Sequence, residues 1–261
     1  SIQKLYAEDT NLIIFQEDKV SRALIDKDAI YSAEGNASIT SSLQVIGQIV
    51  AYAGEYGIST NPESFAVYGN RKYFTDKKRG VVLRLSGGAG GGQGITEISS
   101  YGMHDFFRDE LADATKVVGG WNSHTKDYVL SLQTNSDYKT ATFDEGVLGW
   151  TSFSSYKPSH IFSLSNVFYT FNQDVDINNN LGRLYQHYSG NYAKFYGKTY
   201  NSDVTIVLNS HPSVVKNFKT INYEGGPGWE LESMIASSTD KTLPIGKYVF
   251  QENLASLENQ I

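Results

Sequence analysis

Residues 65–86 read FAVYGNRKYFTDKKRGVVLRLS, and this stretch decides the fold because its pattern returns later in the chain. The second copy, at residues 161–189, reads IFSLSNVFYTFNQDVDINNNLGRLYQHYS. Both copies begin with an asparagine-led turn and continue into an aromatic strand that closes at Asp or Asn. A second strand that starts at Gly then follows. Turn residues between two strand-like runs are typical of β-hairpins, so each copy is expected to form short antiparallel strands.

The two copies also define a repeat length. Asn70 aligns with Asn166, which lies 96 residues later, and this spacing is two periods of 48. Hairpin-like segments at 119–132 and 11–25 stand near the intermediate and the preceding positions. A period of about 40–50 residues, with several short strands in each unit, is typical of propeller blades. The other aligned pairs are Tyr73 with Tyr169, Asp76 with Asn172, and Gly80 with Gly182.

Composition favours the same class of fold. Aromatic residues make up 13% of the 261 residues and charged residues only 19%, with 24 glycines. Tyr and Phe favour pleated, half-buried surfaces, and glycines serve turns. The sequence therefore predicts an all-β, β-propeller-like array of short antiparallel sheets over residues 1–225, with one or two short peripheral helices. Residues 226–261 are expected to form a separate C-terminal segment.

The clearest repeat unit is expected to contain four strands, at 65–69, 72–76, 80–85 and 95–99. Residues 11–25 and 38–56 are read as extended, as are the later runs 116–121, 127–132, 140–144, 147–153, 194–200, 203–209 and 214–225. Residues 99–114 form the best helix candidate, because Met103, Phe107 and Leu111 recur at helical spacing. This helix is expected to be a peripheral addition between blades. The spacing of Leu254, Leu257 and Ile261 places them on one helical face, so this stretch is read as a short terminal helix or a docking segment.

Charge and cysteine content argue against several classes of protein. The net charge is −6, so neutralisation of nucleic-acid phosphates is not expected as a main role. The chain has no cysteine, which excludes disulfides and thiolate metal sites. No run of 18 apolar residues occurs, and SIQKLYAEDT lacks the features of a signal peptide. Membrane insertion is not expected. Five basic residues are expected to form a solvated hairpin rim: Arg71, Lys72, Lys77, Lys78 and Arg79.

The glycine-rich stretch at 87–94 is the most conspicuous candidate for a ligand loop. Glycine lets a backbone approach a phosphate closely. The stretch fits neither G-x-G-x-x-G nor a Walker loop, and it joins two strands rather than a strand and a helix. The tip of a hairpin is the favoured interpretation.

Metal sites have weak support. An oxygen-rich cluster is suited to calcium, but it has neither the glycine nor the glutamate that an EF-hand loop requires. Turn hydrogen bonds are the commoner role of such loops. The histidines show no HExxH motif and no i,i+4 pair. The cluster is Asp174, Asp176, Asn178, Asn179 and Asn180; the histidines are His104, His124, His160, His187 and His211.

Two further activities depend on side-chain arrangements that spacing alone cannot give. A glycosidase needs two carboxyl groups about 5–10 Å apart across a cleft. Candidates are Glu17, Asp18, Asp105, Asp109, Glu110, Asp144 and Glu145, for which charged turns are the stronger interpretation. Trp121, Trp150 and Trp229 could stack on sugar rings, or serve as packing residues. No catalytic, cofactor-binding or metal site is expected.

Five segments resemble large virion structural proteins of tailed bacteriophages. In those proteins, blocks like NPESFAVYGNRKYFTDKKRGVVLRLS and FDEGVLGWTSF recur. The similar stretches lie between residues 17 and 225, and the pattern ends after Gly225. The segments are SRALIDKDAIYSAEGN (21–36), GEYGISTNPESFAVYGNRKYFTDKKRGVVLRLS (54–86), GMHDFFRD (102–109), FDEGVLGWTSFSSYKP (143–158) and FSLSNVFYTF (162–171).

The similarity is greatest to tail-end components, including nozzle or muzzle proteins that carry β-propeller domains. This resemblance implies a non-enzymatic structural role in the virion tail, after assembly in the host cytoplasm, in a nozzle, baseplate or tail tip. The implied partners are other tail proteins and further copies in a homo-oligomeric ring, without a cofactor. The alternative is a lectin-like propeller that binds host-surface glycans.

Overall fold

The computed structural model describes residues 1–8, 11–31, 37–88, 91–172 and 182–207, and short stretches between 210 and 258. The chain divides into two compact units, Ser1–Ser202 and Asp203–Ile261. Strands in several short antiparallel sheets dominate both units, so the all-β prediction is confirmed. The unit boundary lies N-terminal to the division expected after residue 225.

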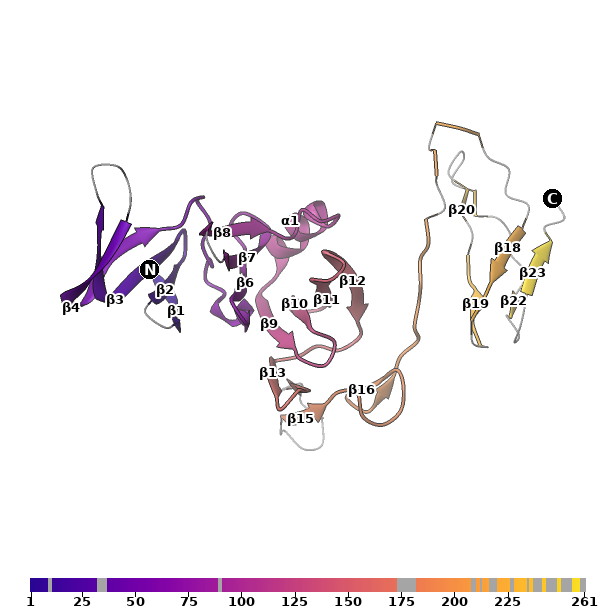
Figure 1. Cartoon of the computed structure of the whole chain (residues 1–261). Coiled ribbons are helices and arrows are strands. Elements are labelled where there is room, and N and C mark those ends of the chain that lie inside the picture. Colours follow the sequence, from indigo (N-terminus) through magenta and orange to yellow (C-terminus); the bar gives the residue numbers. More distant parts are fainter. Residues whose placement is uncertain are drawn as a thin grey trace. The chain divides into compact units, whose positions relative to one another are not determined.

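Among the described residues, the first unit contains four sheets of three or four strands and a final two-stranded hairpin, each built from consecutive strands in chain order (Figure 1). The first sheet is β1 (Ile2–Glu8), β2 (Asn11–Gln16), β3 (Val20–Tyr31) and β4 (Ala37–Ala51). The second sheet is β5 (Ala66–Tyr68), β6 (Arg71–Asp76), β7 (Val81–Gly88) and β8 (Gly91–Glu97). The third sheet is β9 (Lys116–Asn122), β10 (Asp127–Gln133), β11 (Tyr138–Asp144) and β12 (Gly149–Ser154). The fourth sheet is β13 (His160–Leu164), β14 (Val167–Asn172) and β15 (Arg183–Gln186).

The sequence repeat corresponds to a structural repeat. Its two copies occupy the second and the fourth sheet, two sheets apart as the double period required. Asn70 lies in the turn between β5 and β6, and Asn166 in the turn between β13 and β14. Tyr73 and Tyr169 are the third residues of the strands that follow, β6 and β14.

The two tyrosines nevertheless differ in their surroundings. Tyr73 is fully buried, whereas Tyr169 is only half-buried and stacks on its cross-strand neighbour Phe162 at a centroid distance of 5.6 Å. The second sheet has a neighbouring sheet on both faces. Among the described residues of the first unit, the fourth sheet has a neighbouring sheet on one face only. The difference in burial follows from this position in the stack.

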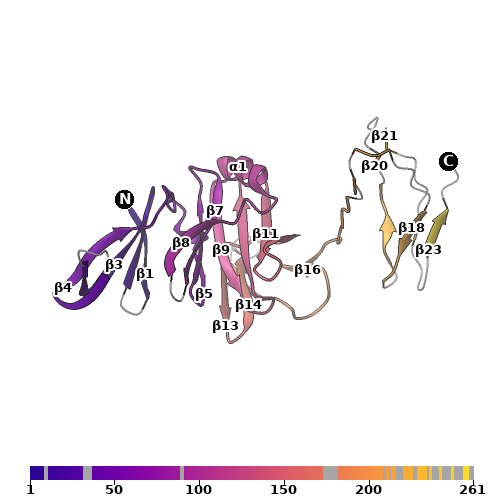
Figure 2. The same ribbon diagram turned by 45° about the horizontal axis from the view of Figure 1, so that its top comes forward.

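Figure 2 shows the first, second and third sheets standing side by side in chain order. Each of the four sheets packs on the next through a hydrophobic core cluster. Phe15 of the first sheet meets Phe74 of the second at a centroid distance of 5.1 Å. Tyr73 faces the other way and packs with Tyr128 of the third sheet. Ile161 of the fourth sheet completes the cluster against the far face of the third. Because successive strand residues point to opposite faces, β6 contributes to two cores at once.

The first strands of three sheets lie together. β9 contacts β5 on one side and β13 on the other. The close approach depends on Gly119 and Gly120: an added Cβ would lie 2.1 Å from the Ser64 carbonyl oxygen at the first and 2.2 Å from Ile161 Cγ2 at the second.

Helix α1 (His104–Asp113) occurs where the apolar spacing placed it, and most of its residues are exposed. Phe107 and Leu111 are both 0% exposed and belong to the core between the second and third sheets. Their i, i+4 spacing places both side chains on the one face of the helix that packs against the sheets. The short 3₁₀ helix η1 (Pro62–Ser64) precedes β5. In the described part of the chain, no helix has the length and apolar character needed to cross a membrane.

Three other expectations change. Residues 203–207 form no strand, although most of them are residues that favour strands. Strand propensity reflects packing against a neighbouring strand, and the exposed side chains of this segment have no such packing. The prediction of a terminal helix is wrong, because Ala255–Glu258 is strand β23, which pairs with β18 (Thr220–Tyr223). The pairing between the two strands overrides the helical spacing of the apolar residues. Strand β1 was not anticipated.

The short hairpin β16 (Lys194–Phe195) and β17 (Lys198–Thr199) ends the first unit. In the second unit, three strand pairs are nested along the chain. β18 pairs with β23, β19 with β22, and β20 with β21. The bounds of the inner strands are β19 (Glu230–Leu231), β20 (Ile235–Ala236), β21 (Lys241–Thr242) and β22 (Tyr248–Val249).

Candidate assembly surfaces

Aromatic rings from four strands stack between the second and third sheets. Trp121 of β9 lies against Tyr68 at 4.2 Å and against Tyr73 at 5.5 Å between ring centroids. Tyr73 in turn stacks on Tyr128 at 4.9 Å. Offset ring pairs stabilise beyond the area they bury, by about 0.5–1.5 kcal/mol each. Trp121, a candidate for sugar stacking, is therefore a packing residue at 8% exposure.

A carboxylate whose side chain is 9% exposed connects the same two sheets. Glu145, in the turn after β11, accepts a hydrogen bond of 2.6 Å from the Tyr73 hydroxyl. Its other oxygen accepts a 2.6 Å bond from Arg84 Nη1, with Arg71 Nη1 at 3.7 Å. Burial, and then the bond to Glu145, raise the pKa of Tyr73 well above its usual value, so the phenol stays protonated. This charge network holds the third sheet on the second.

Trp150 also has a packing role. Its ring contacts Phe107 of α1 at 4.4 Å, and its Nε1 donates a 3.0 Å hydrogen bond to the Ile98 carbonyl oxygen. The third tryptophan, Trp229 of the second unit, is 38% exposed. Two of the three tryptophans therefore face cores rather than solvent.

A histidine lies within an aromatic cluster on the inner face of the fourth sheet. His187 is half-buried beside the rings of Tyr156 at 4.7 Å and Phe168 at 4.9 Å. Its Nε2 lies 2.7 Å from Thr170 Oγ1, which also contacts the Tyr196 hydroxyl at 2.8 Å. Burial lowers the pKa of His187 to about 4, so the imidazole is neutral near pH 7.

Acidification is expected to destabilise the first unit through His187. The unfolded chain takes up this proton at a pKa of 6.5, the folded chain at about 4. The stability that His187 contributes is therefore complete above the unfolded pKa and is lost as pH falls towards the folded one. The free energy of unfolding should fall by at most about 1.4 kcal/mol for each pH unit through this one proton, and the partial exposure of His187 makes the fall smaller.

Urea unfolding at a series of pH values would measure the effect. His187→Gln keeps a group that bonds Thr170 but cannot take up the proton, so its stability should fall less steeply than that of the parent between about pH 7 and pH 4.5. Parallel curves for the two proteins would show that His187 is not the responsible group.

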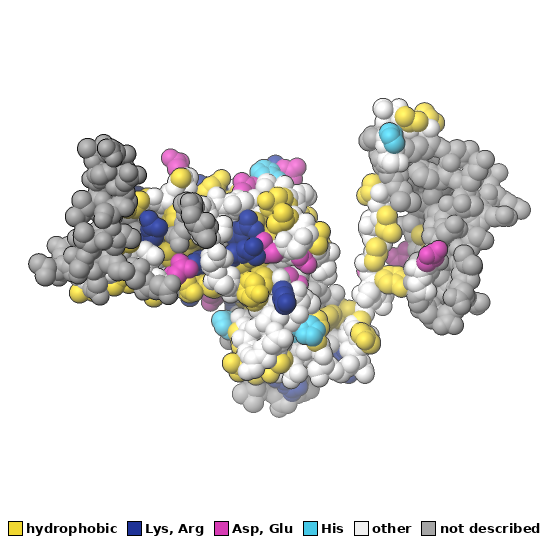
Figure 3. Space-filling view, in the orientation of Figure 1, with side chains coloured by type: hydrophobic (Ala, Val, Ile, Leu, Met, Phe, Trp, Pro, Cys, Tyr) yellow, Lys and Arg dark blue, Asp and Glu magenta, His cyan; other side chains and the backbone are white. Residues whose placement is uncertain are grey.

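Within the first unit, the outer face of the fourth sheet is apolar and uncovered by described residues. Paired residues of antiparallel strands share a face, so Phe162 lies with Tyr169, and Phe171 with Leu184. Leu184 is 57% exposed, and Leu164 at the strand end is 65% exposed. Hydrophobic side chains also gather over the region of β13 and β15 in Figure 3. Large exposed apolar faces mark interaction sites.

The carboxylates proposed as a possible glycosidase pair all have structural partners. Glu17 and Asp18 pair with Lys78 at 3.5 Å and 2.9 Å. Asp105 and Asp109 both pair with Arg108 on the surface of α1. The others are engaged in the same way: Glu110 with Lys139, Asp144 with the backbone of Gly146 and Val147, and Glu145 with the two arginines and Tyr73. These contacts fix turns and helix surfaces.

The histidines are dispersed. His104 lies beside Asp105, His124 stacks on Tyr188 at 4.1 Å, and His160 packs near Phe162. Among the residues that the structure describes, no group of three potential ligands could hold a metal ion. The oxygen-rich cluster at Asp174, Asp176 and Asn178–Asn180 lies outside the described residues.

The glycine-rich stretch lies where the sequence placed it. Gly88 of β7 pairs with Gly91 of β8, so the stretch joins two strands at a hairpin. Ala89 and Gly90 at the tip lie outside the described residues.

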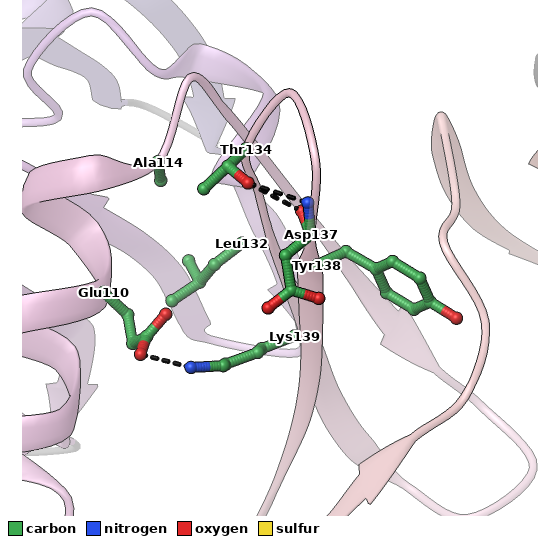
Figure 4. A pocket seen from close by; sticks show the side chains of 7 residues that line it. All are labelled: Glu110, Ala114, Leu132, Thr134, Asp137, Tyr138 and Lys139. Atoms are coloured by element: carbon green, nitrogen blue, oxygen red, sulfur yellow. Dashed lines mark hydrogen bonds and ion pairs between the residues drawn. The ribbon is translucent and has the colours of Figure 1, made fainter.

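A small hollow beside α1 is too restricted to serve as a typical ligand site (Figure 4). The cavity volume is about 10 Å³, far below the roughly 300–1,000 Å³ of small-molecule sites. Lys139 pairs with Glu110 across it, and Thr134 bonds the backbone of Asp137 at its rim. The lining residues are thus already paired with one another.

Comparison with known families gives one match. Residues 190–245 match the family described as the Crassvirus muzzle protein C-terminal domain. The matched region begins in the first unit, continues into the second, and extends past Gly225, where the resemblance to phage proteins ended. No curated protein matches the chain. The family match supports a phage virion structural protein related to the tail.

Proposed function

We propose that this chain is a non-enzymatic structural component of the virion tail, in a nozzle, baseplate or tail-tip assembly. The observation that carries the proposal is the match of residues 190–245 to the muzzle protein C-terminal domain. The resemblance of segments between residues 17 and 225 to virion proteins of tailed phages points the same way. Two separate parts of the chain therefore support one role.

The way in which the sheets of the first unit are joined suits a structural protein. Its sheets are joined by aromatic packing and by the buried Glu145 network rather than by hydrogen bonds along open strand edges. The carboxylates considered for catalysis are engaged in such contacts. In the proposed assembly, the sheets form a propeller-like array, and several copies associate into a ring. Rings of this kind arise from head-to-tail contacts that close by rotation.

Quantitative mass spectrometry of purified particles tests the proposal. The chain should be present at a fixed copy number, in whole-number ratio to other tail proteins, and imaging should locate it at the distal tail. Its absence from washed particles, with normal expression in infected cells, would contradict the assignment.

Glycan binding is the alternative role. Tyr192 is 100% exposed and Tyr188 is 57% exposed, and both lie in or beside the matched region. Exposed rings can stack on sugars, but two of the three tryptophans are committed to packing. A glycan array in which Tyr188→Ala/Tyr192→Ala removes a specific signal would favour this role. Equal signals from the parent and the variant, or no signal from either, would contradict glycan binding through these two rings.

A further inference from the structure

Three oxygen-bearing side chains lie in a row at one end of the third sheet. Asn122 of β9 lies opposite Asp127 of β10, and Asp127 lies opposite Asp144 of β11. Directly opposite residues share a face and have Cβ atoms about 4.5–5.5 Å apart. This face packs against the fourth sheet, because Val129, two residues after Asp127, belongs to that core. Two carboxylates and an amide oxygen therefore meet at the junction of the third and fourth sheets.

Asp127 is buried without a cationic partner. It is 7% exposed, and the residue directly opposite it is a second aspartate. Two further carboxylates with little exposure, Asp76 and Glu145, each pair with an arginine. Among the described residues, no Lys, Arg or His pairs with Asp127. Buried charges are normally paired or bound to a metal, and like charges directly opposite in a sheet are destabilising. Asp127 therefore needs a positive charge that the described part of the chain does not supply.

One oxygen of Asp127 also lacks a hydrogen bond. Its Oδ1 atom is buried and has no partner among the described residues, and the same is true of Ser123 Oγ in the turn between β9 and β10. A bound water or ion is one explanation of such an atom. Burial and the charge of Asp144 raise the pKa of Asp127, so a proton is the competing occupant. A proton binds one oxygen, whereas a metal ion contacts several and accounts for both atoms.

The surrounding hydrogen bonds hold the other oxygens in place. Asn122 is 2% exposed; its Oδ1 accepts a 3.1 Å bond from the His124 amide, and its Nδ2 donates a 2.7 Å bond to the Tyr188 hydroxyl. Asp144 Oδ1 accepts bonds from two backbone amides of the following turn, and its Oδ2 takes no part in them. Asp144 is only partly buried, so water can reach this end of the row.

We propose that Asp127 and Asp144 bind a divalent cation of the calcium class at this end of the third sheet. Asp127 Oδ1 and Asp144 Oδ2 supply the charged contacts, and Asn122 and Ser123 supply uncharged oxygens. Calcium accepts carboxylate, amide and water oxygens in flexible geometry, to a total of about six to eight, so water from the side of Asp144 completes the shell. The ion offsets the repulsion between the two aspartates and stabilises the first unit. The site does not depend on the proposed tail role.

Asp127→Asn and Asp144→Asn test the site in the full chain, because each removes one charge and keeps the size of the side chain. Asp109→Asn is the matched control: Asp109 is 66% exposed on α1 and pairs with Arg108. Thermal unfolding would be compared in calcium chloride and in EGTA. At about 5 mM calcium, the unfolding midpoint of the parent and of the control should rise by about 3 °C, since a site with few charged ligands binds in the range of about 0.1–1 mM. Neither Asp127→Asn nor Asp144→Asn should show this rise.

The sign of the change without calcium is a second readout. In EGTA, Asp127→Asn and Asp144→Asn should be at least as stable as the parent, because two like charges no longer face each other. Magnesium chloride at the same concentration controls for screening by salt. Magnesium requires octahedral geometry and loses its waters reluctantly, so its shift should be smaller than that of calcium. Equal shifts with the two salts would overturn the assignment to calcium.

Terbium luminescence would report the ion directly. Terbium bound beside Asn122 should emit when tyrosine is excited, because Tyr188 bonds to Asn122. Calcium should displace this signal, and Asp127→Asn should remove it. Equal midpoints of the parent in calcium and in EGTA would overturn the proposal in favour of a proton. A calcium shift that persists in both aspartate variants would also overturn it, because the ion would then bind elsewhere in the chain.

Discussion

Replacing Gly119 with alanine is expected to destabilise the first unit by about 3 kcal/mol, at the upper end of the cost of overpacking. The new Cβ would lie 2.1 Å from the Ser64 carbonyl oxygen and 2.7 Å from the Tyr128 hydroxyl. The Tyr128 hydroxyl donates a 2.7 Å hydrogen bond to that same carbonyl, so the methyl group also disrupts this bond. Backbone atoms cannot rotate away as a flexible side chain can, and the second and third sheets must separate.

Urea unfolding followed by tryptophan emission would measure the change. A Trp229→Phe background confines the signal to Trp121 and Trp150, both in the first unit. Gly94→Ala is the matched control: Gly94 lies in β8, and its Cβ would meet no atom within 4 Å. The control should stay within about 0.5 kcal/mol of the parent. Equal stability of the two variants would contradict close packing of β9 at this point.

Replacing Glu145 with alanine is expected to cost about 3 kcal/mol, because it breaks a buried charge network by removing one side. Arg84 is 14% exposed and would keep its charge without the carboxylate at 2.6 Å. The buried Tyr73 hydroxyl would lose its acceptor at the same time. An unpaired buried donor bears the cost of its desolvation.

Two further variants, measured by urea unfolding in the same way, show why Glu145→Ala loses stability. Glu145→Gln retains an amide oxygen for one donor and should fall between the parent and the alanine variant. Asp109→Ala removes an ion pair on the surface of α1, where Asp109 is 66% exposed, and should cost less than about 1 kcal/mol. A loss for the Asp109 variant as large as for Glu145→Ala would mean that burial does not determine the effect.

Much of the first unit could be predicted from local patterns. The turns at Asn70 and Asn166, and the strands that follow them, are short-range features in which side-chain type determines backbone shape. The period of 48 correctly placed the two copies two sheets apart. The helix was found from its i, i+4 spacing. These features share one property: neighbours in sequence define them.

Features that depend on distant partners were missed. The burial of α1 comes from the sheets around it, and the absence of a strand at Asp203–Val207 comes from the lack of a pairing edge. Glu145 looked like an ordinary charged turn residue, because its partners Tyr73 and Arg84 are more than 60 positions earlier. The apolar outer face of the fourth sheet could also be recognised only once the strand pairing was known.

Strictly consecutive order of strands and sheets has a consequence for synthesis. Each sheet packs on the one made just before it, so the first unit can fold vectorially as it leaves the ribosome, without waiting for its C-terminus. We expect nascent chains arrested beyond β12 to show protease-resistant first and second sheets already. Resistance that appears only after release of the completed chain would rule out this order of events.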